Sequence, residues 1–235
     1  MFDWLSGKKT ASLTIDIHSH LIPHIDDGVK SLDESITILQ TFEELGFTKV
    51  ITTPHIYPEV YPNEERTILE KFSILKEEAE SRGITLKLEC AAEYFLDTTF
   101  LERVKKGEDI LSFGDKYVLF ETSFYAKPLI IDEAVFHLKS RGFKPVMAHP
   151  ERYQYLENDF GWLKTQRENG VKMQVNLPSL VGAYGKIPKR NATKLLDNSM
   201  VDFLGSDIHR PSQISVLKKS LKHRIKKNRL LNDNL

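Results

Sequence analysis

The sequence of 235 residues predicts a single parallel α/β domain, and two observations carry this prediction. Short apolar runs alternate with amphipathic or charged segments roughly seven times, which is typical of strand–helix units around a parallel sheet. Almost every apolar run also ends in a histidine or an acidic residue. Such residues meet at one rim if the strands close into a barrel, whereas they spread along an edge if the sheet stays open. The pattern therefore favours a barrel.

The first half of the chain predicts three strands and three helices. Strands are expected over 13–17, 49–53 and 86–92, which are short, apolar and partly β-branched. The first helix starts at the capping box Ser31-x-x-Glu34 and ends at Gly46, because glycine is favoured just beyond a helix. A proline-containing loop then precedes a long charged helix over 64–82, and a third helix covers 98–106.

The second half continues the alternation. Strands are expected over 117–120, 145–148, 171–175 and 201–206. Helices are expected over 131–141, 159–169, 188–198 and 211–228. The last of these is strongly basic from Lys218 onward around an apolar seam, so we expect it to pack on the barrel with its basic face in solvent. A second interpretation is that this face docks onto anionic lipid near a membrane.

These elements predict one barrel over 13–228 with a short tail at each end. The N-terminal tail covers 1–12, and we expect it to be a loose end at the bottom of the barrel. The C-terminal tail covers 229–235.

Composition narrows the classes of protein that remain. Lys and Arg number 33 and Asp and Glu also number 33, so no global field favours nucleic acid as a partner. Cys90 is the single cysteine, which excludes an internal disulfide framework and fits a reducing compartment. No apolar run is long enough to span a bilayer, and the N-terminus lacks the apolar core of a secretory signal. A cytoplasmic protein is expected.

The polar residues at the strand ends, taken with one loop aspartate, form a candidate metal site. The set is His18, His20, Asp27, His55, Glu93, Glu121, His149, Asp207 and His209. Histidine and carboxylate without thiolate suits zinc, manganese or iron, and the share of oxygen ligands leans toward manganese or iron. The set is too large for one ion, so two or three ions that share bridging carboxylates are expected.

These residues lie in short motifs that together resemble a known superfamily. The motifs are Asp16-Ile17-His18-Ser19-His20, Asp26-Asp27-Gly28, Pro54-His55, Ala92-Glu93, Phe120-Glu121, Ala148-His149-Pro150-Glu151-Arg152-Tyr153, Gln174-Val175-Asn176 and Ser206-Asp207-Ile208-His209. The sequence resembles the polymerase-and-histidinol-phosphatase (PHP) superfamily. Within it, the resemblance is to the bacterial metal-dependent protein-tyrosine phosphatases of capsular and exopolysaccharide loci, over residues 13–228.

The resemblance implies a distorted (β/α)7 barrel with three metal ions at its rim. It places one ion on His18, His20, Glu93 and Asp207. It places a second on Glu93, Glu121 and His149, with Glu93 as the bridge, and a third on Asp27, His55 and His209. Manganese is the ion that the resemblance implies, while iron and zinc stay open.

The resemblance also implies hydrolysis of phosphotyrosine on a protein. The expected partner is the tyrosine-rich tail of a membrane-bound bacterial tyrosine kinase that controls export of a surface polysaccharide. Arg152 follows a predicted ligand by three residues, and its planar guanidinium suits phosphate. Arg152, His55 and His209 are the predicted catalytic residues, and the proton that the leaving group needs could come from a metal-bound water or from one of the rim histidines. The predicted substrate contacts are Arg152, Tyr153, Asn176 and Arg210.

Two alternatives stay open from the sequence, and a third is disfavoured by it. A phosphatase for a small metabolite such as histidinol phosphate would use the same metals. A non-catalytic metal-binding scaffold in polysaccharide assembly is possible in principle, although such a scaffold has no need of a charged open cluster. An amidohydrolase would carry a metal-bridging lysine where Glu93 and Glu121 stand. Cysteine-dependent phosphatase chemistry is excluded, because Cys-x5-Arg would require arginine in place of Leu96, and a P-loop enzyme is disfavoured by the lack of a Walker A motif.

Overall fold

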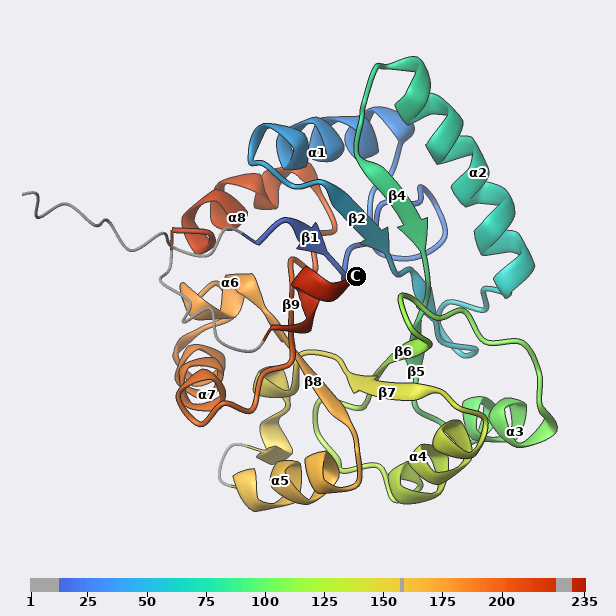
Figure 1. The fold of residues 1–235 in the computed structure, drawn as a ribbon, viewed down its shortest axis with the longest axis vertical. Coiled ribbons are helices and arrows are strands. Elements are labelled where there is room, and N and C mark those ends of the chain that lie inside the picture. Colours follow the sequence, from blue (N-terminus) through green and yellow to red (C-terminus); the bar gives the residue numbers. More distant parts are fainter. Residues whose placement is uncertain (1–12, 157–158, 223–229) are drawn as a thin grey trace, which may run out of the picture.

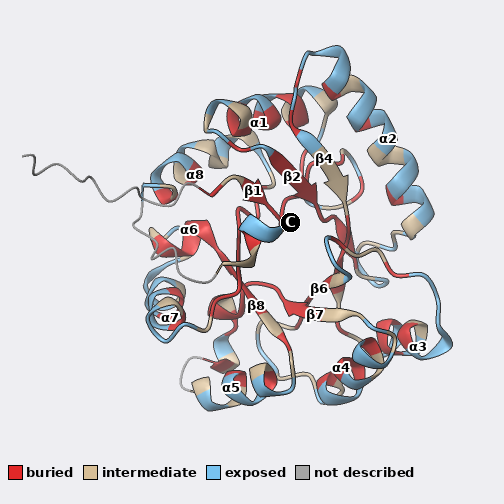
Figure 2. Ribbon diagram, in the orientation of Figure 1, coloured by how far each residue is buried: buried red, intermediate tan, exposed pale blue. Residues whose placement is uncertain are grey.

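The computed structural model describes residues 13–156, 159–222 and 230–235. A ring of helices surrounds a curled parallel sheet (Figure 1), and the buried residues concentrate in the strands inside this ring (Figure 2). The predicted parallel α/β barrel is confirmed. The predicted N-terminal tail over 1–12 lies outside the described residues, and so do residues 223–229, which comprise the end of the helix predicted over 211–228 and the first residue of the predicted C-terminal tail.

The strands form two hydrogen-bonded parallel sheets that together make the barrel wall. One sheet has the order β1 (Ile15–Asp16), β2 (Lys49–Thr52) and β4 (Lys87–Cys90). The other has the order β3 (His55–Ile56), β5 (Glu93–Phe95), β6 (Tyr117–Glu121), β7 (Lys144–Met147), β8 (Lys172–Asn176) and β9 (Phe203–Gly205). The core of each predicted strand is present, and the ends differ by a few residues.

The two sheets meet where two predicted strands are interrupted. Pro54, which has no backbone N–H, lies in the gap between β2 and β3. Pairing continues across the gap, since Ala91 N donates to Thr52 O at 2.9 Å and Glu93 N donates to Pro54 O at 3.0 Å. His55 and Glu93 therefore open a second strand segment instead of following a finished strand. With β2–β3 and β4–β5 each counted once, the wall has the seven segments that were predicted.

The barrel closes between β1 and β9, which lie at the edges of the two sheets. Near the rim, Asp207 N donates to His18 O at 2.7 Å. Deeper, the buried Asp16 carboxylate accepts hydrogen bonds from Ser206 N at 2.7 Å and from Ser206 Oγ at 2.8 Å. Burial raises the pKa of Asp16 to about 7, even though these hydrogen bonds oppose the shift. Below the rim, the Asp16 side chain thus replaces a backbone hydrogen bond between β1 and β9.

The residues over 230–235, predicted as part of a tail, pack into the end of the barrel instead. Asn232 is fully buried, where its Nδ2 donates to Ile15 O at 3.0 Å and to Leu204 O at 2.8 Å, and its Oδ1 accepts from Leu204 N at 3.0 Å. Leu231 and Leu235 pack against a small apolar cluster that includes Ile15. Figure 1 shows the C-terminus in the middle of the ring of strands. The C-terminal residues therefore seal the β1–β9 seam from the end opposite the metal-ligand residues.

The helices cover the outer face of the wall. They are α1 (Leu32–Glu44), α2 (Glu65–Ser81), α3 (Thr98–Lys106), α4 (Ile131–Ser140), α5 (Phe160–Glu168), α6 (Leu177–Leu180), α7 (Lys186–Asp197) and α8 (Ile214–Ser220). Ser31 caps α1 as predicted, since its side chain accepts from Glu34 N at 3.2 Å, although Glu34 itself turns back to Lys30 N instead of Ser31 N. The short α6 was not predicted. No helix among the described residues is long and apolar enough to cross a membrane.

Candidate metal centre and its pocket

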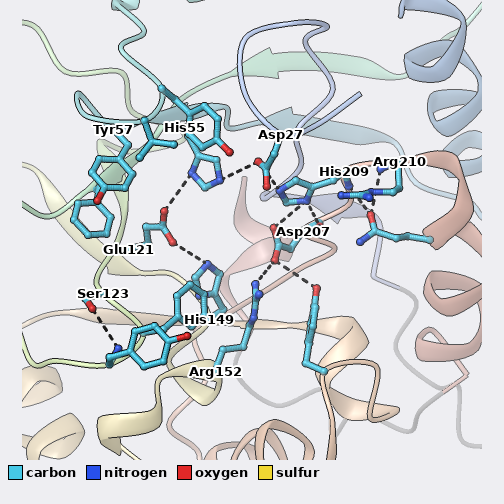
Figure 3. Close-up of a pocket in the computed structure, with 17 residues that line it drawn as sticks. Asp27, His55, Tyr57, Glu121, Ser123, His149, Arg152, Asp207, His209 and Arg210 are labelled. Atoms are coloured by element: carbon cyan, nitrogen blue, oxygen red, sulfur yellow. Dashed lines mark hydrogen bonds and ion pairs between the residues drawn. The ribbon is translucent and has the colours of Figure 1, made fainter. Parts of the chain in front are cut away.

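All nine predicted metal ligands come together at the rim formed by the strand ends, although they are spread from residue 18 to residue 209 in sequence. Their nitrogen and carboxylate oxygen atoms form overlapping groups in which the atoms lie within 4.8 Å of one another. Figure 3 shows six of them around the pocket, with His55, Glu121 and His149 on one side and Asp27, His209 and Asp207 on the other.

The first group joins His18, His20 and Asp207. The Nε2 atoms of His18 and His20 lie 3.3 Å from each other, and each lies 3.5 Å from Asp207 Oδ1. Glu93 Oε2 faces the same point, 3.1 Å from His18 Nε2 and 3.5 Å from His20 Nε2. These four residues are the ones that the resemblance assigned to one ion.

The second group centres on Glu93, and its membership is broader than expected. His149 Nε2 lies 3.0 Å from Glu93 Oε1 and 3.8 Å from Glu121 Oε2. His55 Nδ1 lies 3.2 Å from Glu93 Oε2 and 3.3 Å from Glu121 Oε1, so His55 borders this group as well as the third. The Nδ1 atoms of His55 and His149 are buried without a hydrogen-bond partner. For His55, this nitrogen lies beside both glutamate carboxylates, which fits a position where a cation would lie; His149 instead faces them with Nε2.

The third group lies nearest the solvent. His209 Nε2 is 3.4 Å and His55 Nε2 is 3.5 Å from Asp27 Oδ1, and the side chain of Asp27 is 48% exposed. The His20 ring stacks on the His209 ring with 3.9 Å between centroids. His20 thus lies between the first and third groups, which places the groups side by side in one cluster.

The buried carboxylates of this cluster repel one another, and the neighbouring histidines compensate this repulsion only in part. Burial would raise the pKa of Glu93, but the nearby His18 and His55 rings hold it well below its usual value. Burial raises the pKa of Glu121 well above its usual value, and the charges of Glu93 and Asp207 add to this shift. Ionising both glutamates at neutral pH therefore requires a compensating positive charge. The donor set, all imidazole and carboxylate, fits divalent ions such as manganese, iron or zinc.

A second layer of polar residues orients the histidines. Gln174 Oε1 lies 2.9 Å from His18 Nδ1, and Asp26 Oδ2 lies 2.8 Å from His20 Nδ1. An acceptor on Nδ1 fixes the tautomer that leaves Nε2 free to face a metal. Asn176 Nδ2 donates to Asp207 Oδ2 at 2.6 Å. Asp26 and Gln174 were not predicted to orient ligands, although they lie in the motifs Asp26-Asp27-Gly28 and Gln174-Val175-Asn176.

Two of the ligands have strained backbone. His149 has φ +32° and Asp207 has φ +50°, in the left-handed region that non-glycine residues seldom adopt. Each follows a strand, His149 after β7 and Asp207 after β9. Such strain tends to occur at functional sites, where the surrounding structure holds a side chain in a required direction.

A pocket of about 460 Å³ opens above the ligands. Arg152 lies in its wall, where Nη1 donates to Asp207 Oδ2 at 2.9 Å. Its guanidinium carbon lies 4.9 Å from the Phe124 ring centroid and 4.2 Å from the Tyr184 ring centroid, so two aromatic rings hold it. Arg210 also lines the pocket, at its outer side.

Two predicted substrate contacts do not line this pocket. Tyr153 is 1% exposed, and its hydroxyl accepts from Thr122 N at 3.1 Å beneath the pocket, so the prediction that it touches substrate is wrong. Asn176 is fully buried, and its side-chain amide donates a hydrogen bond to Asp207 Oδ2. It therefore supports a proposed ligand and does not face the pocket. The sequence reasoning missed the aromatic lining, which is Tyr57, Tyr61, Phe95, Phe124, Tyr125 and Tyr184. Those residues follow no periodic pattern that could have indicated it.

Comparison with known proteins places this architecture in a family. The family model described as "Capsular polysaccharide synthesis, CpsB/CapC" matches residues 14–229. The chain belongs to the CpsB/CapC family. This membership confirms the resemblance that the motifs indicated.

CpsB/CapC relatives align over most of the chain. The tyrosine-protein phosphatase CpsB of Streptococcus agalactiae is 31% identical over 200 residues, which is 83% of this chain and 82% of that protein. The tyrosine-protein phosphatase YwqE of Bacillus subtilis is 30% identical over 196 residues, 83% of this chain and 77% of that protein. One similar solved structure is described as coming from YwqE of Bacillus subtilis and CpsB of Streptococcus pneumoniae, unique metal-dependent tyrosine phosphatases. It matches with a TM-score of 0.80 at 28% identity, and the match covers 88% of this chain and 86% of that chain. A histidinol phosphate phosphatase of Lactococcus lactis shares the fold alone, with a TM-score of 0.53 at 13% identity over 90% of this chain and 95% of its own.

Proposed function

We propose that this protein is a manganese-dependent protein-tyrosine phosphatase of the cytoplasm. Its proposed substrate is phosphotyrosine on a bacterial tyrosine kinase that regulates capsule or exopolysaccharide export. The observation that carries the proposal is the convergence of nine imidazole and carboxylate ligands beneath an open pocket with Arg152 in its wall. The names of the CpsB and YwqE relatives support the reaction.

The proposed ligands are those predicted from the sequence, with His55 between two of the groups. Divalent ions in such a cluster lower the pKa of a coordinated water and neutralise charge on a phosphate. Arg152 binds the phosphate oxygens as a planar donor and remains charged, because the pKa of its guanidinium, despite burial, is raised by Asp207. Arg210 at the outer side of the pocket is a further proposed phosphate contact.

The leaving group needs only a modest contribution from the protein. A tyrosyl phenolate has a conjugate acid with a pKa of about 10, so it leaves with less protonation than an alkoxide does. Burial lowers the pKa of His55 to about 4, so this ring is a neutral imidazole at neutral pH and a weak proton donor. His209 also borders the pocket, but its Nε2 lies 3.4 Å from Asp27 Oδ1 in the third ligand group, so we propose His209 as a ligand instead of the proton donor.

The test compares two esters on one metal-loaded protein. The protein is stripped of metal, reloaded with Mn²⁺, Fe²⁺ or Zn²⁺, and assayed on a tyrosine-phosphorylated peptide and on histidinol phosphate. We expect Mn²⁺-dependent release of phosphate from the peptide and at least a 100-fold loss in His149→Ala, because about that much depends on a correctly placed metal. Preference for histidinol phosphate would overturn the substrate. Turnover of neither ester by protein with bound metal would favour the non-catalytic scaffold.

A further inference from the structure

The mouth of the pocket is uneven in character. Figure 3 shows Tyr57 and Ser123 in the left part of the view, above and below Glu121, with Arg210 at the opposite edge of the pocket. The first side is formed by the loop that follows β3 and the loop over 122–130 that follows β6. The opening therefore has an aromatic side and a cationic side.

The aromatic side continues from the floor of the pocket to the surface. The Tyr57 ring stacks on the Phe95 ring with 4.0 Å between centroids and 12° between planes, and both rings line the pocket. Val60, 53% exposed, and Tyr125, 76% exposed, lie at the outer end of this lining. Leu129, four residues beyond Tyr125, is 98% exposed. We call Val60, Tyr125 and Leu129 the docking rim.

The loop over 122–130, which carries Tyr125 and Leu129, is held by hydrogen bonds and an ion pair. Phe124 O accepts from Gln154 N at 2.8 Å, and Tyr125 N donates to Ser123 Oγ at 3.2 Å. Lys127 forms an ion pair with Asp159. The loop over 122–130 is thus tied to the body of the protein while it presents apolar side chains to water. Apolar groups held at the surface beside a pocket are typical of a site that contacts another molecule.

The spacing of the rim suits an extended peptide. Four residues of chain span at most roughly 14 Å, so Tyr125 and Leu129 lie within that distance of each other. Tyr125 lines the pocket, so an extended peptide that passes Tyr125 would reach Leu129 within about four further positions. A small metabolite would not reach Leu129, which does not line the pocket.

We propose that the docking rim binds apolar or aromatic side chains that flank the phosphotyrosine of the protein substrate. The proposal rests on the proposed phosphatase function and adds a sequence preference to it. Continuity between the rim and the aromatic lining of the pocket favours this occupant over a second copy of the chain.

The experiment measures the preference with matched peptides and a matched variant. The metal-loaded protein is assayed on a phosphotyrosyl peptide with Leu or Tyr at the four positions on either side, on the same peptide with Ser and Gly there, and on free phosphotyrosine. Leu129→Ser removes the exposed tip of the rim. Phe136→Ser is the control, because Phe136 is 65% exposed on α4 and lies outside the pocket lining.

For the wild type we expect kcat/KM about fivefold higher on the apolar peptide than on the Ser/Gly peptide, as partial burial of one or two apolar side chains predicts. Leu129→Ser should remove most of this difference by raising KM for the apolar peptide, and kcat/KM on free phosphotyrosine should stay unchanged. Phe136→Ser should behave as the wild type. Equal rates on the two peptides in the wild type would overturn the proposal. So would an equal loss in the two variants.

A binding arm separates this proposal from the proposed function. If no ester is hydrolysed, the phosphatase function fails, and fluorescence anisotropy with the labelled apolar peptide still reports on the rim. A dissociation constant that rises about fivefold in Leu129→Ser but not in Phe136→Ser would support peptide docking without catalysis. The same dissociation constant in all three proteins would reject it.

Discussion

At the scale of single residues, Arg152 shows how position and chemistry combine. The side chain leaves a 3-10 helix over Pro150–Arg152 directly after the ligand His149. It is held by an ion pair to Asp207 and by two aromatic rings, so its guanidinium plane is fixed before any substrate arrives. A preorganised donor costs little ordering when the phosphate binds.

Arg152→Lys should therefore lose activity while keeping its charge. We expect kcat/KM on a phosphotyrosyl peptide to fall about 100-fold, since lysine offers a point charge in place of a planar fork and one oriented donor is worth that much. Steady-state kinetics with metal content measured in parallel would test this. Arg66→Lys, at an exposed site on α2, is the control. Activity within twofold of wild type would show that Arg152 serves only to hold Asp207.

At the scale of elements, β9 carries a tight contact behind the ligands. A Cβ added to Gly205 would lie 2.6 Å from His18 Cβ and 2.9 Å from Gln174 Nε2. Both neighbours belong to the metal centre, because Gln174 orients His18. The glycine lets β9 approach β1 and β8 closely enough to place these side chains.

Gly205→Ala should thus damage the metal centre and the barrel together. We expect about 1–3 kcal/mol lower stability from overpacking, and weaker metal binding because His18 must move. Thermal unfolding and Mn²⁺ titration by calorimetry measure the two effects. Gly161→Ala is the matched control, since Gly161 lies in α5 and its added Cβ would come no nearer than 3.5 Å to Asp159 Oδ1. An unchanged Mn²⁺ affinity in Gly205→Ala would mean that the site tolerates the shift.

At the scale of the whole molecule, the two ends of the barrel have different roles. The strand ends at the rim hold the charged cluster, and the C-terminal residues seal the other end at the β1–β9 seam. Asn232 reaches across 217 positions of sequence to Ile15 O. Three backbone groups of β1 and β9 depend on this one side chain.

Asn232→Ala should destabilise the barrel as a whole. The substitution leaves buried backbone groups without partners, which predicts a free energy of unfolding lower by about 2–4 kcal/mol. Urea unfolding followed by circular dichroism measures it, and exposed Asn234→Ala serves as the comparison. A change below about 0.5 kcal/mol, the range of ordinary surface substitutions, would contradict the role of Asn232 in the seam.

The sequence by itself determined the class of fold and the set of candidate metal-ligand residues that meet at one rim. Alternating apolar and amphipathic segments specify parallel strand–helix units, and a barrel brings the ends of such strands to one rim. His18, Glu93 and Asp207 could therefore be placed together without knowing any contact. This inference depends only on local patterns, which a single sequence displays.

The tertiary structure alone decided which atoms face one another. Gln174 supports His18 across 156 positions, and Asn232 closes the seam, yet neither residue carries a local signal of its partner. Tyr153 adjoins Arg152 in sequence but points into the core, because the 3-10 helix ends at Arg152 and the backbone of Tyr153 is extended. The aromatic side of the pocket likewise combines Tyr57 and Phe95 with the loop over 122–130. Contacts between distant segments arise from packing, and packing has no period that a sequence can reveal.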